Sequence, residues 1–105
     1  MKVALDHVEL DPHTRLVFYR VAQEALSNIT KHSRATAVAI TLTAGSCIEL
    51  RVRDDGCGFD SHAVPTGHLG LTIMRERAES IGATLDVTTS LGTGTELRLS
   101  VRSHR

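Results

Sequence analysis

The stretch Asp54-Asp55-Gly56-Cys57-Gly58-Phe59 decides the interpretation of this 105-residue chain, because it ends an apolar strand face with a carboxylate. In the preceding run 47–54, Leu50 and Val52 share the inward face of a predicted strand. Asp54 has the same parity, and a buried carboxylate is costly unless hydrogen-bond donors compensate it. The two glycines let the backbone pass close to a ligand. The alternative is an ordinary strand end with an Asp-Gly turn.

Patterns on either side of this stretch predict a helix, two strands, a second helix and two more strands. Asp11 suits an N-cap, Pro12 a first helical residue, and Gly82 a C-terminal cap. The expected elements are an edge strand at about 2–10, a helix from Asp11-Pro12 to about His32-Ser33, strands at 36–43 and 47–54, a loop at 55–69, a helix from about Leu71 to Ile81, and strands at 83–90 and 95–102. Strands joined by short turns are antiparallel, so the fold class is α+β. We expect a two-layer sandwich with helices on one face of a mixed, mainly antiparallel sheet.

The first predicted helix is amphipathic and carries a line of polar side chains. At about 100° per residue its apolar side consists of Phe18, Ala22, Ala25, Leu26 and Ile29. On the other side Glu24 and Asn28 are one turn apart, and Lys31 lies on the same line. An acid, an amide and a cation in this arrangement can hold a divalent metal and a phosphate chain. A solvated helix face is the alternative.

Two glycine-containing segments follow later in the chain. Gly67-His68-Leu69-Gly70-Leu71 directly precedes the second predicted helix, where free N–H groups and the helix dipole favour an anion. Gly92-Thr93-Gly94-Thr95 begins the last strand, and Thr95 has the parity of the apolar residues that follow it. Its hydroxyl can therefore share a ligand or a water with Asp54. The alternative is a threonine that merely starts a strand.

Composition describes one ordinary globular domain, spanning residues 1–105. Hydrophobic residues make up 41% and charged residues 23%, and the formal net charge is +0. Without a basic excess or interleaved aromatic residues, nucleic acid is not an expected partner. The two cysteines fit neither a disulfide framework nor a zinc site, which favours a reduced, cytoplasmic setting. No apolar run reaches the roughly 18–20 residues of a membrane span, although a parent protein can be anchored elsewhere.

Taken together and in order, these motifs resemble the ATP-binding catalytic domain of histidine kinases. Tyr19 to Asn28 followed by Lys31-His32 is similar to that family's N box, and 54–58 to its D-x-G-x-G box. The segments 67–71 and 92–95 are similar to its later glycine boxes. Three features resemble the nitrate-sensor-like and DesK-like kinases: the residue sequence of the N box, a short lid, and the segment Met74-Arg75-Glu76-Arg77-Ala78. The family implies a Bergerat-type ATP-binding fold of the gyrase, heat-shock-chaperone, histidine-kinase and MutL superfamily.

The resemblance also implies roles for individual residues. Asp54 should accept a hydrogen bond from the adenine amine, with Thr95 assisting through water. Asn28 should ligate Mg²⁺, and Glu24 should support its water shell. Residues 60–69 should form a lid over ATP. The remaining expected nucleotide contacts are Lys31, His32, Gly56, Gly58, His68, Leu69, Gly70 and Leu71.

The implied reaction transfers the γ-phosphate of Mg-ATP to a histidine on a separate dimerisation and phosphoacceptor domain, with a response regulator downstream. None of the six histidines of this chain lies in an acceptor-like motif, and the isolated domain is expected to be monomeric. An ATP hydrolase with Glu24 as the base and an anti-sigma-type serine kinase are alternatives within the superfamily. A nucleotide-binding module without chemistry is the alternative from another class.

Overall fold

The computed structural model of the chain describes residues 2–29, 37–56, 65–90 and 94–102, with only the backbone for residues 65–71 and 90. Within these residues, five strands form one sheet in the order β1-β2-β3-β5-β4. The strands are β1 Lys2–Leu5, β2 Val38–Thr43, β3 Cys47–Asp54, β4 Thr84–Ser90 and β5 Gly94–Arg102. β1 pairs with β2 in parallel, and the other neighbours are antiparallel. The predicted mixed, mainly antiparallel sheet is confirmed.

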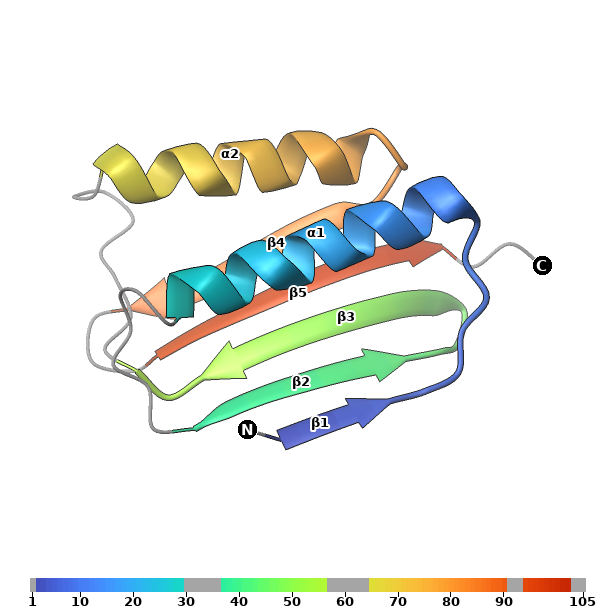
Figure 1. Cartoon of the computed structure of the whole chain (residues 1–105), viewed down its shortest axis with the longest axis horizontal. Helices are drawn as coiled ribbons and strands as arrows, with labels where there is room; N and C mark the ends of the chain where they lie inside the picture. Colours follow the sequence, from blue (N-terminus) through green and yellow to red (C-terminus); the bar gives the residue numbers. More distant parts are fainter. Residues whose placement is uncertain (1, 30–36, 57–64, 91–93, 103–105) are drawn as a thin grey trace.

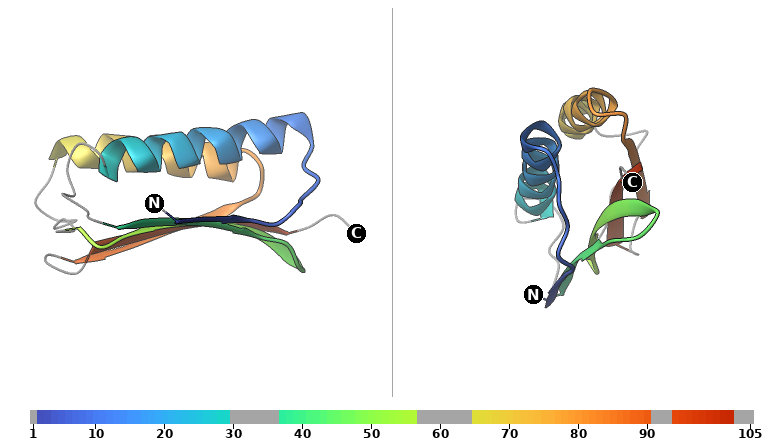
Figure 2. Two further views of the ribbon diagram at one scale, coloured as in Figure 1. Left: turned by 60° about the horizontal axis from the view of Figure 1, so that its bottom comes forward. Right: turned by 90° about the vertical axis from the view of Figure 1, so that its right-hand side faces the viewer.

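Both described helices, α1 Pro12–Asn28 and α2 Pro65–Glu79, lie side by side on one face of this sheet (Figures 1 and 2). α1 packs over β3 and β5, while α2 contacts β4 and α1. The predicted two-layer α+β architecture is therefore confirmed. In the described part of the chain no helix is both long and apolar enough to cross a membrane.

Apolar rows cross the helix-facing side of β3, β5 and β4. One row is Val52, Leu97 and Val87, and the next is Leu50, Leu99 and Leu85. All of these side chains are buried except Val87, which packs partly buried against the core. Burial of each such side chain stabilises the fold by about 1.5–3 kcal/mol. A slip of one residue would turn a whole strand's apolar side chains to solvent, so these rows determine the register.

Helix α1 begins as its sequence predicts, but its buried stripe is rotated. Asp11 is the N-cap, its Oδ1 accepts the N–H of Thr14 at 3.0 Å, and Pro12 follows in the first turn. The buried residues are Val17, Phe18, Val21 and Ala25, whereas Ala22, Leu26 and Ile29 are half-buried. The rotation has a physical reason: α1 packs against α2 as well as the sheet. The expected helix end near His32-Ser33 lies outside the described residues.

Helix α2 begins at Pro65, about six residues before the predicted start at Leu71, so the second half of the expected lid is helical. Proline fits the first turn of a helix, where its N–H is not needed. Gly67 and Gly70 do not prevent this earlier start, because each interior glycine costs a helix only about 1 kcal/mol. The predicted cap at Gly82 is confirmed. It has φ of 69°, and the N–H groups of Gly82 and Ala83 donate to the carbonyls of Glu79 and Ala78 at 3.0 and 2.9 Å.

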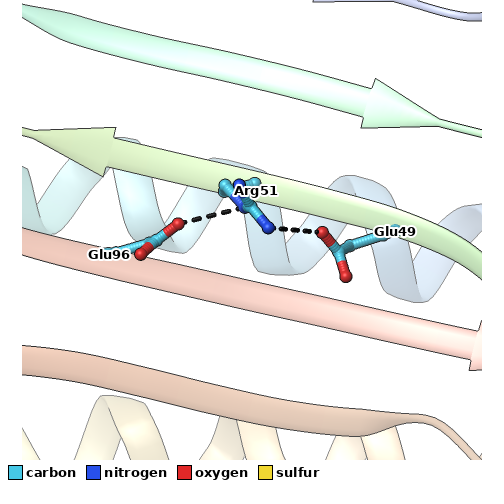
Figure 3. Close-up of polar contacts among 3 residues, drawn as sticks. All are labelled: Glu49, Arg51 and Glu96. Atoms are coloured by element: carbon cyan, nitrogen blue, oxygen red, sulfur yellow. Dashed lines mark hydrogen bonds and ion pairs between the residues drawn. The ribbon is translucent and has the colours of Figure 1, made fainter.

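The sheet face away from the helices carries a small charged cluster. Arg51 lies between Glu49, on the same strand β3, and Glu96 on β5. Both carboxylates approach its guanidinium to 3.0 Å (Figure 3). The Glu49 contact is also a hydrogen bond. The Nε of Arg51 has no hydrogen-bond geometry toward Glu96, so that contact is an ion pair only. Because the Arg51 side chain is 42% exposed, these pairs contribute at most about 1 kcal/mol each.

Candidate functional site

The apolar rows of the core end in one polar row at the end of the sheet. Asp54 of β3 pairs with Thr95 of β5, and Thr95 pairs in turn with Thr89 of β4. The three residues continue the parity of the buried Val52 and Leu97 beside them, so they belong to the helix-facing side of the sheet. The sequence predicted inward positions for Asp54 and Thr95, and the register confirms both.

Asp54 is the one polar residue among the buried side chains of the described chain, and it is 5% exposed. Its Oδ1 accepts the backbone N–H of Gly56 at 2.8 Å. Among the residues that the structure describes, no group donates a hydrogen bond to its Oδ2. A buried carboxylate is a strong acceptor, and its second oxygen is the atom that a neutral donor on a ligand would engage.

Gly94 holds the backbone next to Asp54. It is buried at the start of β5 with φ of 91°, in the left-handed region that disfavours side chains. A Cβ added there would lie 2.2 Å from the carbonyl oxygen of Asp54 and 3.2 Å from the Cα of Asp55. Only glycine therefore allows β5 to approach the end of β3 so closely.

Asp55 fastens the end of β3 to the start of β2. Its backbone N–H donates to the carbonyl of Ala37 at 3.2 Å, and its Oδ1 accepts the Ala37 N–H at 2.8 Å. The side chain of Asp55 is thus engaged with the backbone, while that of Asp54 points into the core. The two adjacent carboxylates lie in different environments, and the one that faces the core is the ligand candidate.

Two helix ends lie at the same end of the molecule as the polar row. Figure 1 shows there the C-terminal end of α1 and the N-terminal end of α2, together with the end of β3 and the start of β5. Asn28 is half-buried at the last residue of α1, and Glu24 is exposed one turn earlier. Among the described residues, no three His, Cys, Asp or Glu side chains lie close enough together to hold a metal ion. An amide oxygen from Asn28 together with phosphate oxygens and waters fits the needs of Mg²⁺.

Several predicted contacts lie elsewhere or outside the described residues. Lys31, His32 and Gly58 are not among the described residues. The segment Gly67–Leu71, expected before the helix, lies within α2. The N–H groups of Leu69, Gly70 and Leu71 therefore point along the helix to carbonyls four residues earlier, and those of Thr66 and Gly67 in the first turn have no such partner. Because the helix starts at Pro65, an anion site of the expected kind would lie at this first turn and not at residues 69–71.

Thr89 and Gly94 are parts of this site to which the sequence analysis gave no role. Thr89 has the parity of Leu85 and Val87, which face the core, so alternation along the strand identifies it as an inward position. Gly94 stands in a glycine-containing segment whose sequence does not say which glycine has positive φ. The need for glycine at that position comes from β3, which is distant in sequence.

A hollow of about 600 Å³ lies at the other end of the sheet. It is lined in part by Leu10, Thr14, Ile48 and Val101. Ile48 and Val101 are at the far ends of β3 and β5 from Asp54 and Thr95. Its size alone does not make it the functional site, because the buried carboxylate and the inward hydroxyls lie at the opposite end.

Comparison with known proteins agrees with this geometry. Residues 13–105 match the family described as histidine kinase-, DNA gyrase B-, and HSP90-like ATPase. The chain is 42% identical over 95 residues to the sensor histidine kinase YhcY of Bacillus subtilis, covering 85% of this chain and 24% of that protein. It is 37% identical over 86 residues to the nitrate/nitrite sensor protein NarX of Escherichia coli, covering 81% of this chain and 14% of that protein. The blue-light activated histidine kinase of Erythrobacter litoralis EL346 superimposes with a TM-score of 0.77 at 28% identity, covering 96% of this chain and 34% of that one.

Proposed function

The chain belongs to the histidine kinase-, DNA gyrase B-, and HSP90-like ATPase family and corresponds to the ATP-binding catalytic part of sensor histidine kinases; from this premise we propose its reaction. It binds Mg-ATP and donates the γ-phosphate to a histidine on a separate dimerisation and phosphoacceptor domain. The chain spans 14% of NarX and 24% of YhcY, which leaves room in them for such a domain. The observation that carries the proposal is the buried Asp54 beside the inward Thr95.

Asp54 and Thr95 suit the recognition of adenine. Adenine presents an amino group that donates hydrogen bonds and, next to it, the N1 atom that accepts one. The available carboxylate oxygen of Asp54 accepts from the amine, and the Thr95 hydroxyl lies across the strand pair at the same level. Burial strengthens this contact, because water competes less for a carboxylate that is 5% exposed.

The phosphates would then extend toward the helices. The first-turn N–H groups of Thr66 and Gly67 and the N-terminal dipole of α2 favour an anion at this end. Asn28 would supply one oxygen ligand to Mg²⁺, a hard ion that favours oxygen donors. Glu24 is exposed one turn away, where its carboxylate can hold a metal-bound water. Lys31 and His32 follow Asn28 in the sequence and are proposed as phosphate contacts.

In the reaction, a histidine nitrogen of the acceptor domain attacks the γ-phosphorus. An N–P bond forms while the bond from phosphorus to the bridging oxygen breaks, and ADP leaves. Positioning and charge stabilisation account for most catalysis of phosphoryl transfer. The nucleophile therefore comes from the partner domain, while this chain supplies the binding site. The phosphohistidine would pass its phosphoryl group to a response regulator, in the cytoplasm where ATP is available.

The leading alternative is an ATP hydrolase, in which Glu24 activates water. General-base assistance contributes about 10²–10⁴-fold to a rate, so the two roles differ measurably. The isolated chain should bind ATP, hydrolyse it slowly, and leave no phosphate on itself. With its acceptor domain added, it should produce a phosphohistidine that is labile to acid and stable to base.

Three results would favour the alternatives. Rapid ATP turnover by the isolated chain, abolished in Glu24→Ala, would support the hydrolase. An acid-stable phosphoprotein product would support a serine kinase. Binding of ATP without either product, in the presence of the acceptor domain, would support a nucleotide-binding module.

A further inference from the structure

Two consecutive carboxylates stand at the end of β3, and each accepts a backbone N–H group. The Oδ1 of Asp54 accepts the N–H of Gly56, two residues later, at 2.8 Å. This bond within one short segment is an Asx turn. The Oδ1 of Asp55 accepts the N–H of Ala37, which directly precedes β2, also at 2.8 Å. Asp54 is buried, whereas Asp55 and Ala37 are exposed.

The ladder between β2 and β3 ends in an unusual way. Val38 pairs with Asp54, so Ala37 and Asp55 stand in register for the next pair. In an antiparallel ladder, a hydrogen-bonded pair exchanges both N–H···O bonds between its backbones. The backbone N–H of Asp55 does donate to the carbonyl of Ala37 at 3.2 Å. The return bond goes from Ala37 to the Asp55 carboxylate, which takes the place of the Asp55 carbonyl.

This change of acceptor allows the chain to leave β3 directly after Asp54. An extended strand advances roughly 6.6 Å over two residues and would carry the Gly56 N–H away from the Asp54 carboxylate. The bond from Gly56 to Asp54 therefore requires a bend at Asp55, which turns the Asp55 carbonyl out of the ladder. Because the Asp55 side chain accepts in its place, Ala37 keeps a partner while the chain bends.

We propose that Asp55 is a positioning residue, whose carboxylate fixes the bend after β3 and so holds the Asp54 carboxylate at the nucleotide site. This inference rests on the proposed function and adds a residue that acts on the nucleotide only through Asp54. Gly94 lies on the other side of the bend, where an added Cβ would be 3.2 Å from the Cα of Asp55. The bend is thus held by the Asp55 carboxylate toward β2 and by Gly94 toward β5.

Removal of the carboxylate should affect the orientation of Asp54 more than the stability of the fold. In Asp55→Ala, the acceptor that remains on residue 55 for the Ala37 N–H is the backbone carbonyl. That ladder bond straightens the chain and competes with the bond from Gly56 to Asp54. Because Asp55 and Ala37 are exposed, water can hydrate the Ala37 N–H, and the variant should lose little stability.

Asp6 provides a matched control at the opposite end of β2. Its backbone N–H donates to the carbonyl of Leu42 at 2.8 Å, and its Oδ2 accepts the N–H of Ala44 at 3.1 Å. Asp6 therefore joins two strand ends with the same two kinds of bond as Asp55, and it is also exposed. Asp6→Ala removes such a bond without a change at the end of the sheet that carries Asp54.

The experiment measures calorimetric affinities for ADP and adenosine, together with stability in urea. Asp55→Ala should bind both ligands about two- to tenfold more weakly, the range for loss of one hydrogen bond. The loss should be equal for the two ligands, because Asp54 is assigned to the base that they share. Asp55→Asn, which keeps an oxygen acceptor without the charge, should restore both affinities. Asp6→Ala should leave both affinities unchanged.

A double-mutant cycle tests whether Asp55 acts through Asp54. In the Asp54→Ala background, Asp55→Ala should cause no further loss of ADP affinity, because the carboxylate to be positioned is already absent. The same loss in that background as in the wild-type chain would show that Asp55 acts independently of Asp54, and would overturn the inference.

Wild-type ADP affinity in a folded Asp55→Ala variant, or an equal loss in Asp6→Ala, would leave Asp55 a purely structural role. If Asp55→Ala does not fold by circular dichroism, Asp55→Glu carries the same comparison, because it keeps the charge and displaces the carboxylate by one methylene. Loss of affinity in Asp54→Ala without loss in Asp55→Ala refutes this inference alone. Failure of the wild-type chain to bind either ligand refutes the proposed function as well.

Discussion

Gly94→Ala should lower both the stability of the domain and the affinity of its proposed nucleotide site. The added Cβ would lie 2.2 Å from the carbonyl oxygen of Asp54, at a residue with φ of 91°. Restoring an ordinary contact requires the end of β3 and the start of β5 to separate by about 1 Å or more. That movement disturbs the pairing of Asp54 with Thr95 and the hydrogen bond from Gly56 to Asp54.

Gly82→Ala is the matched control for this change. Gly82 also has positive φ, 69°, but no atom lies within 4 Å of the position of an added Cβ. Its cost is the left-handed backbone alone, about 1–2 kcal/mol. Gly94→Ala adds the collision and the loss of one or two hydrogen bonds at about 1 kcal/mol each, for a total of about 3 kcal/mol. For a domain of this size, each kcal/mol corresponds to a shift in Tm of about 4–8 °C.

Urea denaturation followed by circular dichroism gives the two free energies of unfolding, and calorimetry with ADP gives the affinities. Gly94→Ala should lose more stability than Gly82→Ala and also bind ADP more weakly, because Gly94 touches Asp54. Gly82→Ala should keep the wild-type ADP affinity. Equal losses of stability in the two variants, or full ADP affinity in Gly94→Ala, would refute the role given to the close approach of β3 and β5.

The remaining predictions concern the ligand contacts. Asp54→Ala should lower the affinity for ATP and ADP alike by about one to two decades, because a charge-assisted hydrogen bond contributes about 1.5–3 kcal/mol. An unchanged calorimetric affinity in a folded variant would show that Asp54 does not recognise the base. Asn28→Ala should weaken binding of Mg-ATP much more than binding of adenosine, and equal losses would indicate a distorted pocket instead of a metal ligand. Hydrogen exchange should slow at residues 65–69 when an ATP analogue and Mg²⁺ bind; protection there that is unchanged by nucleotide would contradict a contact between the start of α2 and the phosphates.

The strands were predictable from sequence because their information is local. Alternation placed Leu50, Val52 and Asp54 on one face without reference to the rest of the fold, and burial of all three confirms it. Asp11 and Gly82 were recognisable as caps for the same reason, since each acts within its own turn. The carboxylate of the site was therefore detectable as a departure from the parity of its own strand.

The features that sequence analysis missed depend on contacts between distant segments. The buried stripe of α1 includes Val17 and Val21 because a second helix packs beside it, and the sequence of α1 does not contain the position of that helix. The start of α2 at Pro65 was not predictable from local propensity, because the proline favours a helix start there while Gly67 and Gly70 disfavour a helix. The contact between the Thr89 and Thr95 hydroxyls joins two strands, so neither strand alone predicts it.

The geometry of the polar row is maintained by residues that contact no ligand. Asp54 faces Thr95 because Val52 pairs with Leu97 and Leu50 with Leu99 in the adjacent rows. If β3 slipped by one residue against β5, Asp54 would turn to the open face together with Leu50 and Val52. The apolar burial that excludes this slip also holds the carboxylate at the proposed base site. Substitutions in these rows should therefore affect nucleotide affinity only when they loosen the register, and substitutions in the polar row should affect affinity while the register remains intact.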